Sequence, residues 1–333
     1  MEITELDVQD DVALRAVYDV EARANHLDRE DAPQWSWQEM SGAARRPDPG
    51  ERQCFFVGRV EGRTVGFCIV YLSLHDNLDK CWIEVKVDPA EQHRGFGRLL
   101  LERAVEVATV EGRTAVVIET VLPFDRVTDH RYRRFAEAAG FTLANVEIIR
   151  DLPLPVATDQ LDAWAARAAL KSSDYRIETH VNVVPENLVP SLVVLHGQLG
   201  VDAPTGEVDW EEELITPERF TESRAALVAA GRTMYETVAI APDGTVAAQS
   251  TISVPPAGRL DVSQWGTFVH REHRGHTLGL AVKVANLRAV QEAHPEMRRV
   301  RTQNAETNDW MVAINVEMGF EPIEASVELV RRS

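Results

Sequence analysis

Cysteine is scarce in this chain of 333 residues. The three cysteines are Cys54, Cys68 and Cys81, and none of them forms a CxxC pair. This number and spacing argue against a disulfide framework and against a zinc site. We therefore interpret all three as buried thiols in a reducing cytoplasm.

Long apolar runs are also absent. No stretch approaches the ~20 apolar residues of a membrane-spanning helix. The N-terminal Met-Glu-Ile-Thr-Glu-Leu-Asp is acidic where a secretory signal would be basic and then apolar. We expect a cytoplasmic protein that is neither exported nor embedded in a membrane.

Positive charge is in short supply. The chain has 35 Lys and Arg against 53 Asp and Glu, a net charge of −18. Long-range repulsion opposes general binding to nucleic acid or anionic lipid, so nucleic acid is an unlikely partner. The charge is compatible with a cationic substrate, although acidic surfaces mostly serve solubility.

Two common phosphate-binding motifs are missing as well. Neither the Walker pattern GxxxxGK[ST] nor a GxGxxG fingerprint near a first strand occurs. What is present is a shorter turn that occurs twice, as Gln92-His93-Arg94-Gly95-Phe96-Gly97 and as Arg274-Gly275-His276-Thr277-Leu278-Gly279. In each copy an apolar strand pattern precedes the turn and an amphipathic helix pattern follows it. Such a junction directs free backbone N–H groups and a helix dipole at one point, which suits an anion.

The two copies belong to an internal duplication. They lie 182 residues apart, and a Gly-Phe pair recurs after 179 residues, at Gly140 and Gly319. We expect an α/β fold with mixed sheets in two tandem domains, residues 1–155 and 175–333, joined by a linking helix within 156–174. The prolines of 151–155 are expected to end the first domain.

The context of the turn resembles motif A of the GCN5-related N-acetyltransferases (GNAT), in which [QR]xxGx[GA] wraps the pyrophosphate of acetyl-CoA. The later segment 308–320 resembles the family's NxxAxxxYxxxGF helix. The chain thus resembles a tandem of two GNAT acyl-CoA acyltransferase domains, similar in arrangement to mycothiol synthase. The resemblance implies coenzyme contacts from Val85, Val87, Gln92, His93, Arg94, Gly95, Phe96, Gly97 and Arg98 in the first half and from Val269, Arg274, Gly275, His276, Thr277, Leu278, Gly279, Asn304 and Asn308 in the second.

The two halves depart from the family pattern in opposite ways. The first keeps both glycines of the turn, but has Asp129 in place of the coenzyme-contacting Asn and Ala136 in place of the tyrosine acid. The second keeps Asn308, but has Thr277 for the first glycine and Asn315 for the tyrosine. Thr277 is expected to take a helical φ and weaken the site. Neither half has the usual phenolic acid.

Acetyl transfer to an amine needs a neutral nucleophile. Glu84, in the strand before the first turn, is our candidate base, with an exposed residue on an alternating strand as the equally weighted alternative. The second half has Gly266 at the matching position, which favours the first half for chemistry. Trp35, Trp37 and Tyr71 are candidates for an acceptor pocket, with packing the favoured role for each.

These features predict an N-acetyltransferase that uses acetyl-CoA, without a metal, to acetylate the amine of a small molecule, with a cationic metabolite as one candidate. Two alternatives stay open. One is a transferase with another acyl donor, a longer acyl-CoA or an aminoacyl-tRNA. The other is a non-catalytic module that binds acyl-CoA, which the two missing tyrosines permit.

Overall fold

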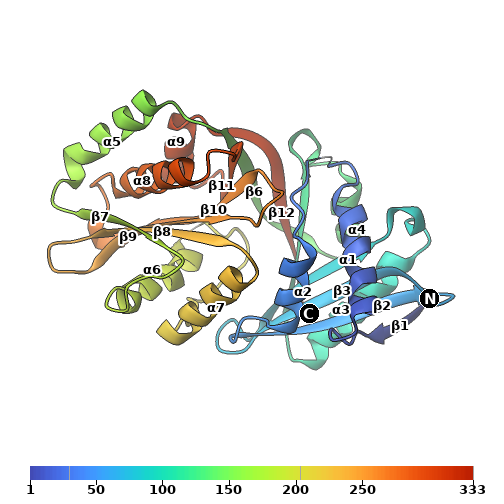
Figure 1. Cartoon of the computed structure of the whole chain (residues 1–333). Helices are drawn as coiled ribbons and strands as arrows, with labels where there is room; N and C mark the ends of the chain where they lie inside the picture. The colour runs from blue at the N-terminus through green and yellow to red at the C-terminus, as the bar shows by residue number, and fades with distance from the viewer. Residues whose placement is uncertain (30, 203, 333) are drawn as a thin grey trace. The chain divides into compact units, whose positions relative to one another are not determined.

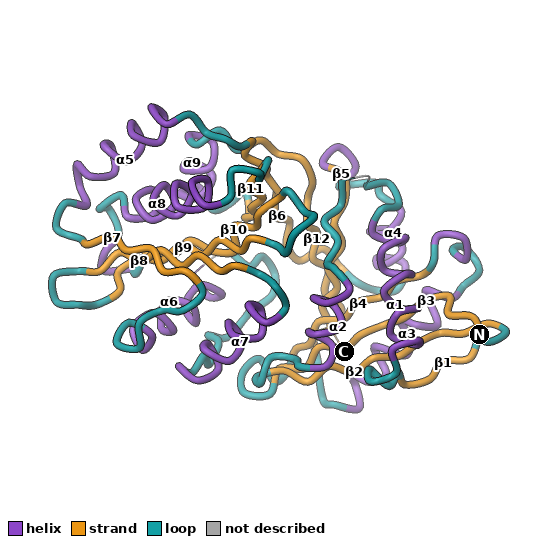
Figure 2. Tube along the Cα trace, viewed as in Figure 1, coloured by secondary structure: helices purple, strands orange, loops and turns teal. Residues whose placement is uncertain are grey.

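The computed structural model describes residues 1–29, 31–202 and 204–332. The chain forms two compact units, shown in Figures 1 and 2. The first unit comprises 1–146, 205–211 and 324–333, and the second comprises 147–204 and 212–323. We describe each unit separately.

The first unit contains a mixed sheet and four α-helices among its described residues. Its elements are β1 (Glu2–Glu5), α1 (Asp11–Asn25), α2 (Trp37–Arg45), β2 (Glu51–Val60), β3 (Arg63–Ser73), β4 (Lys80–Val87), η1 (Pro89–Glu91), α3 (Phe96–Val110), β5 (Ala115–Pro123), η2 (Phe124–Arg126), α4 (Arg131–Ala138) and most of β12 (Glu321–Arg332). The strand order is β1-β2-β3-β4-β5-β12. Only β4 and β5 pair in parallel, and the other neighbours are antiparallel.

Local sequence explains several of these elements. Glu61 and Gly62 both take positive φ, 51° and 77°, as a two-residue hairpin between β2 and β3 requires. Ser36 caps α2 in a capping box with Glu39. The apolar stripe of α1 packs on one face of β2 and β3, around Val57 and Phe67.

The second unit repeats this plan. Its elements are most of β6 (Thr142–Pro153), α5 (Thr158–Ser172), β7 (Arg176–Val181), α6 (Val189–Asp202), α7 (Pro217–Ala229), β8 (Thr233–Ile240), β9 (Val246–Val254), β10 (Asp261–Val269), η3 (Arg271–His273), α8 (Leu278–Ala293), β11 (Arg299–Ala305) and α9 (Asp309–Glu317). The strand order is β7-β8-β9-β10-β11-β6, with β10 and β11 parallel. In Figure 1, α5, α8 and α9 lie on one side of this sheet and α6 and α7 on the other.

Each unit takes its last strand from the distant part of the chain. β12, at the C-terminus, pairs with β5 of the first unit over nine residues, Glu324↔Pro123 to Arg332↔Ala115. β6 pairs with β11 of the second unit from Glu147 to Pro153. Because of this exchange of β6 and β12, the two compact units do not coincide with the expected domains. The division of the repeat into 1–155, 156–174 and 175–333 stays a prediction.

Two expectations about local structure were wrong, and two helices were not predicted. The prolines of 151–155 do not end the first unit, because Pro153 closes strand β6 and its missing N–H falls at the end of the ladder. Helices α2 and α7, which were not predicted from the sequence, start at capped positions, Ser36 and Thr216. Cys54 is half-buried rather than buried, whereas burial raises the pKa of Cys68 and Cys81 to about 12.

Candidate active site

The two turns have the same backbone conformation. His93 and its counterpart Gly275 have φ of 62° and 84°, and Gly95 and Thr277 have φ of 83° and 55°. Each turn follows a short 3₁₀ helix, and an α-helix begins directly after Gly95 or Thr277. The expectation that Thr277 takes a helical φ was wrong, because position 277 is left-handed as in the glycine copy. Its hydroxyl donates to Ala168 O at 2.8 Å, which offsets part of the strain.

The first turn keeps space for a ligand at the N-terminus of α3. A Cβ at Gly97 would meet Phe135 at 3.4 Å and Val87 at 3.6 Å. The first N–H groups of α3 have no intrahelical acceptor, so they are oriented for an anion. Phe96 follows as the first residue of the helix, and Arg94 lies over its ring at 4.9 Å.

A gap between β4 and β5 lies next to this turn. The two strands pair only from Lys80↔Ala115 to Ile83↔Ile118, so Glu84 and the residues after it are not paired with β5. Asp88 N donates to Val65 O of β3 at 2.9 Å. Because N–H groups alternate along a strand, those of Val85 and Val87 point away from β3, into the gap.

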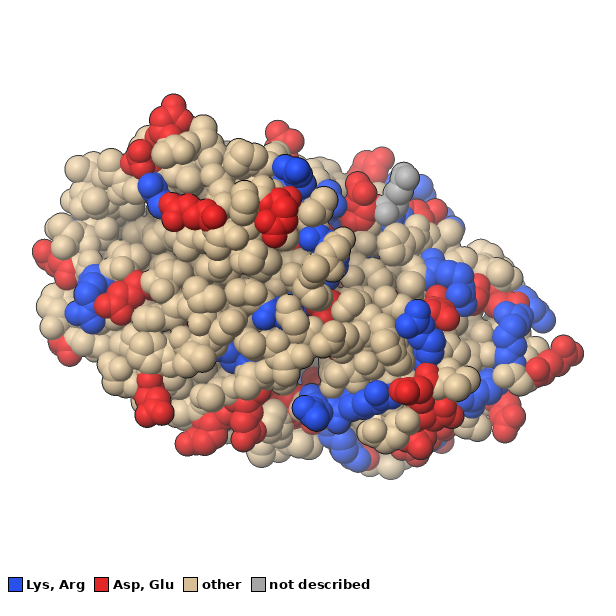
Figure 3. Space-filling view, in the orientation of Figure 1, with Lys and Arg blue, Asp and Glu red and all other residues tan. Residues whose placement is uncertain are grey.

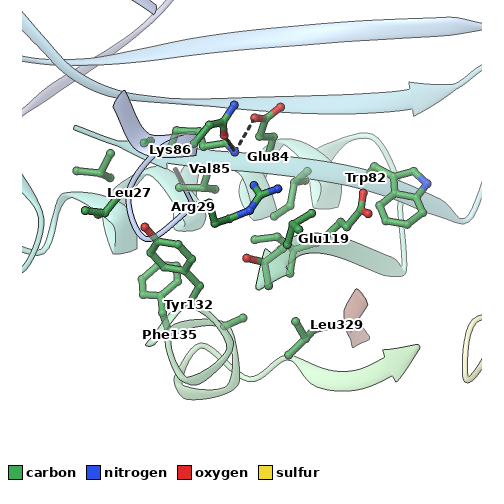
Figure 4. Close-up of a pocket in the computed structure, with 18 of the residues that line it drawn as sticks. Leu27, Arg29, Trp82, Glu84, Val85, Lys86, Glu119, Tyr132, Phe135 and Leu329 are labelled. Carbon is green, nitrogen blue, oxygen red and sulfur yellow. Dashed lines mark hydrogen bonds and ion pairs between the residues drawn. The ribbon is translucent and has the colours of Figure 1, made fainter. Parts of the chain in front are cut away.

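A cavity of ≈ 510 Å³ occupies this gap (Figure 4). Residues from α1, the loop after it, the strands and α4 line it: Ala24, Asn25, Leu27, Arg29, Glu51, Tyr71, Trp82, Ile83, Glu84, Val85, Lys86, Val87, Gln92, Ile118, Glu119, Thr120, Val121, Tyr132, Phe135, Ala136 and Leu329. In Figure 4, Trp82 and Glu119 lie toward one end, and Leu27, Tyr132 and Phe135 toward the other.

Glu84 lies within a polar cluster in this cavity. Its Oε2 accepts a hydrogen bond from Tyr71 Oη at 3.1 Å, and its Oε1 is 3.5 Å from Lys86 Nζ. Lys86 Nζ also donates to Asn25 Oδ1 at 2.6 Å. Burial, followed by the charge of Glu84, raises the pKa of nearby Glu21 to about 7. The cluster therefore holds two carboxylates, one of which titrates near neutral pH.

The end of the cavity near Trp82 combines carboxylates with aromatic rings. Trp82 stacks on Trp210, with ring centroids 5.3 Å apart and an interplanar angle of 6°. Glu119 accepts a hydrogen bond from the Ser326 hydroxyl. Arg29 forms a bidentate pair with Glu324, which offsets its charge. This end therefore suits a cationic group more than an anion.

The arginines of the first turn are engaged with carboxylates. Arg94 pairs with Glu91, and Arg98 pairs with Glu102 at 2.8 Å. Both arginine side chains are exposed, at 54% and 79%, so these pairs contribute little to stability and are easily exchanged. Gln92 Nε2 donates to Val87 O at 3.4 Å, and both residues line the cavity.

The second turn is more strongly tied to its own unit. Asp202 pairs with Arg271 and with Arg274, and its side chain is only 5% exposed. The hydrogen bond from Arg271 lowers the pKa of Asp202 below its ordinary value. The Asp202 carboxylate is therefore an anion that already lies at this turn. His273 Nδ1 lies 3.0 Å from Tyr175 Oη, and His276 lies against the same ring. Leu278 and Gly279 are buried in α8.

The other expected coenzyme contacts of the second unit have structural partners. Asn308 caps α9 by accepting from Met311 N at 3.3 Å. Asn304 Oδ1 accepts from Arg150 Nη1 at 3.2 Å and from Asn315 Nδ2 at 2.9 Å. Asn315 Oδ1 in turn accepts from Lys283 Nζ at 2.8 Å. The network Lys283–Asn315–Asn304–Arg150 is buried throughout.

This network lies where the second unit's strands part. β10 and β11 pair only up to Ser263↔Arg301, and Asn304 lies three residues beyond that point. Val269 ends β10, as Val87 ends β4. Gly266 contributes no side chain here, and a Cβ added to it would meet Leu199 at 3.2 Å and Gln249 at 3.5 Å.

Of the expected aromatic candidates, Tyr71 lines the cavity of the first unit. Trp37 packs edge-on against Tyr18 in the core beside α1, and Trp35 is 39% exposed. Sequence reasoning missed Glu21, Arg29, Glu119 and Tyr132. Of these, only Tyr132 could have been found from the sequence, because it lies four residues before Ala136 and therefore on the same face of the helix.

No metal site accompanies these residues. Among the described residues, no group of three or more His, Cys, Asp and Glu side chains is arranged to hold a metal ion. The described residues also include no helix that is long and apolar enough to cross a membrane.

Known proteins resemble this chain in part of its sequence and in its fold. Residues 14–141 match the model of the acetyltransferase (GNAT) family. A tandem GNAT protein from the clavulanic acid biosynthesis pathway is 26% identical, with a TM-score of 0.79 over 99% of this chain and 98% of its own. A GCN5-related N-acetyltransferase from Sphaerobacter thermophilus has 15% identity and a TM-score of 0.61 over 99% of this chain and 95% of its own. No curated protein sequence gives a significant match.

The family match covers residues 14–141, most of the first unit, and the family it describes uses acetyl-CoA as cosubstrate. The second unit has the same order of strand, turn and helix as the first, and the similarity to the tandem GNAT protein extends over both units. This confirms the resemblance seen in the sequence.

Proposed function

We propose that the first unit transfers the acetyl group of acetyl-CoA to the amine of a small cationic molecule, by direct attack while both substrates are bound. The observation that carries this proposal is the ≈ 510 Å³ cavity between β4 and β5. Gln92 of the phosphate-binding turn lines this cavity together with Glu84 and Trp82.

The first turn fits the pyrophosphate of the coenzyme. Its left-handed residues, His93 and Gly95, direct backbone N–H groups at one point, and the lack of a Cβ at Gly97 keeps the cradle open. The exposed Arg94 and Arg98 are positioned to exchange their carboxylate partners for phosphate oxygens. When bound, the coenzyme supplies an acetyl thioester.

Glu84 is our proposed base. An amine with a pKa of ~10.4 costs about 4 to 5 kcal/mol to keep neutral at pH 7, so a proton acceptor beside it lowers the barrier. Glu84 combines partial exposure with anchoring by Tyr71, and it lines the cavity. If Glu84 were only an exposed residue on an alternating strand, its position in the cavity would have no explanation.

Backbone amides are proposed to polarise the thioester carbonyl. The N–H groups of Val85 and Val87 point into the gap between β4 and β5, as argued above. Fixed donors aimed at the developing negative charge stabilise the transition state. The side chains of these valines pack in the protein while their amides donate, so the two roles are compatible.

The acceptor is proposed to be cationic because of the charges along the cavity. Glu51, Glu84 and Glu119 line it, whereas the charge of Arg29 is offset by Glu324. The stacked ring of Trp82 provides a face for an organic cation. Basic and acidic side chains are interspersed over much of the face shown in Figure 3, with a short run of basic residues near its lower edge. The net charge of −18 disfavours an aminoacyl-tRNA donor.

We propose that the second unit is structural, or at most a weaker coenzyme site. Asp202 competes for the arginine of its turn, and the buried network around Lys283 fills the region where its strands part. No carboxylate corresponds to Glu84 there, because position 266 is glycine.

The test is thiol release from acetyl-CoA, with mass spectrometry of the product, across matched amines. We expect acetylation of 1,5-diaminopentane with a lower KM than that of 1-aminopentane, and the highest KM for 6-aminohexanoate. Calorimetric binding of acetyl-CoA without turnover of any amine would instead support the non-catalytic module.

A further inference from the structure

The apex of the gap between β4 and β5 is lined by apolar groups. The last pair before the strands part is Ile83↔Ile118, and Leu329 of β12 lies opposite Ile118 on the other side of β5. These three side chains are 3%, 9% and 0% exposed. All three line the cavity, so they give it an apolar region, which we call its floor.

A small residue, Ala136, lines the same cavity. The resemblance to the family places a tyrosine there, but the residue is Ala136, which is 2% exposed and also lines the cavity. A methyl group thus takes the place of a phenol ring on the lining of the cavity to which Leu329 and Phe135 also contribute. An acetyl group, with one methyl beyond its carbonyl, leaves such a space unfilled, and unfilled apolar space is unfavourable.

We propose that the first unit prefers acyl-CoA donors with a short apolar chain longer than acetyl, of the propanoyl to butanoyl class, and that Ala136 determines this preference. The inference rests on the proposed function of the same cavity. The chemistry of transfer is unchanged: the acyl C–S bond breaks, the C–N bond forms, Glu84 accepts the proton of the amine, and the thiolate leaves and is protonated by solvent.

The magnitude follows from the burial of methylene groups. Each buried CH₂ contributes ~0.8 kcal/mol, which corresponds to about a fourfold change in kcat/KM. The kcat/KM of butanoyl-CoA, which has two more methylenes than acetyl-CoA, should therefore exceed that of acetyl-CoA by about 16-fold. Chains that outgrow the space should lose this gain, because overpacking costs more than the added burial.

The experiment compares kcat/KM for acetyl-, propanoyl-, butanoyl- and octanoyl-CoA with one amine acceptor. The wild-type protein should show a maximum at propanoyl or butanoyl. Ala136→Phe should lower kcat/KM for butanoyl-CoA at least tenfold while changing acetyl-CoA less than threefold. Ala138→Phe, on the exposed side of α4, is the matched control and should leave the chain-length profile unchanged.

The wild-type profile decides the inference even where Ala136→Phe fails to fold. A fall in kcat/KM from acetyl-CoA onward overturns the preference while leaving acetyl transfer intact. If no acyl-CoA is turned over, the proposed function fails, and calorimetry then tests the inference alone: tighter binding of butanoyl-CoA than of acetyl-CoA supports it, and equal or weaker binding overturns it.

Discussion

Replacing Lys283 with methionine should stabilise the second unit in a pH-dependent way. Lys283 is 1% exposed, and burial lowers its pKa from 10.5 to about 7. Its Nζ donates to Asn315 and lies 4.9 Å from the ring of Phe320, and in the described part of the chain it forms no ion pair with a carboxylate. The folded unit therefore disfavours the charged form.

The magnitude and sign follow from linkage. A shift from 10.5 to about 7 corresponds to about 5 kcal/mol of lost stability at any pH where Lys283 is protonated in both the folded and the unfolded chain. The loss is complete below pH 7, shrinks as the pH rises above 7, and vanishes above 10.5. Lys283→Met removes this loss but leaves Asn315 Oδ1 without its donor, which costs about 1 to 3 kcal/mol at every pH.

The assay is urea unfolding at several pH values, with hydrogen exchange in α8 as the local probe, because a chain of two units need not unfold in one step. The advantage of Lys283→Met over wild type should be largest at pH 6 and should decrease by about 3 kcal/mol by pH 9.5. Parallel stability profiles of the two proteins would refute the reasoning, since a pH-independent difference reflects packing alone.

Two further predictions concern the cluster around Glu84. Glu84→Gln should lower kcat, measured by thiol release, by ~10²-fold or more, while calorimetry shows unchanged coenzyme binding. Near-normal turnover would instead leave substrate positioning and carbonyl polarisation as the main contributions to catalysis. Glu21 has its pKa raised from 4.5 to about 7, so its contribution to stability is present below 4.5 and is lost as the pH rises toward 7. Glu21→Gln should therefore be more stable than wild type at pH 8 by up to about 3 kcal/mol in urea unfolding. For wild type we expect the KM for a cationic amine to decrease as the pH rises through 7, because Glu21 becomes charged, and Glu21→Gln should abolish this decrease. A KM step near pH 7 that survives Glu21→Gln would assign it to another group.

Much of the local structure could be predicted from the sequence because the signals are local. The apolar strands, the helices after each turn and the Glu61-Gly62 hairpin follow from periodicity and turn chemistry. α2 and α7 escaped prediction because their segments are mostly polar, and only their caps indicated a helix.

The exchange of β6 and β12 could not be predicted from local pattern. A strand's apolar alternation shows that it is half-buried, but not which sheet it joins. The prolines after Asp151 suggested a boundary, whereas the pairing of β6 with β11 runs through that position to Pro153.

The candidate site was predictable in part. The turns and Glu84 carried a recognisable spacing, and the structure places Glu84 and Gln92 in one cavity. Glu21, Arg29 and Glu119 come to that cavity or its neighbourhood from separate elements, with no spacing that connects them. The network of Lys283, Asn315 and Asn304 was equally hidden, because buried polar contacts depend on tertiary packing.

The most direct test of the account compares acetyl transfer by Gly97→Glu and Gly279→Glu. The two glycines are matched: a Cβ would meet Phe135 at 3.4 Å in the first unit and Ile314 at 3.3 Å in the second. Each glutamate adds the same bulk and a negative charge at one of the two turns proposed to bind phosphate. We predict that Gly97→Glu abolishes thiol release and coenzyme binding, whereas Gly279→Glu, if folded, keeps most of both. Activity that survives Gly97→Glu and is lost in a folded Gly279→Glu would contradict the assignment of catalysis to the first unit.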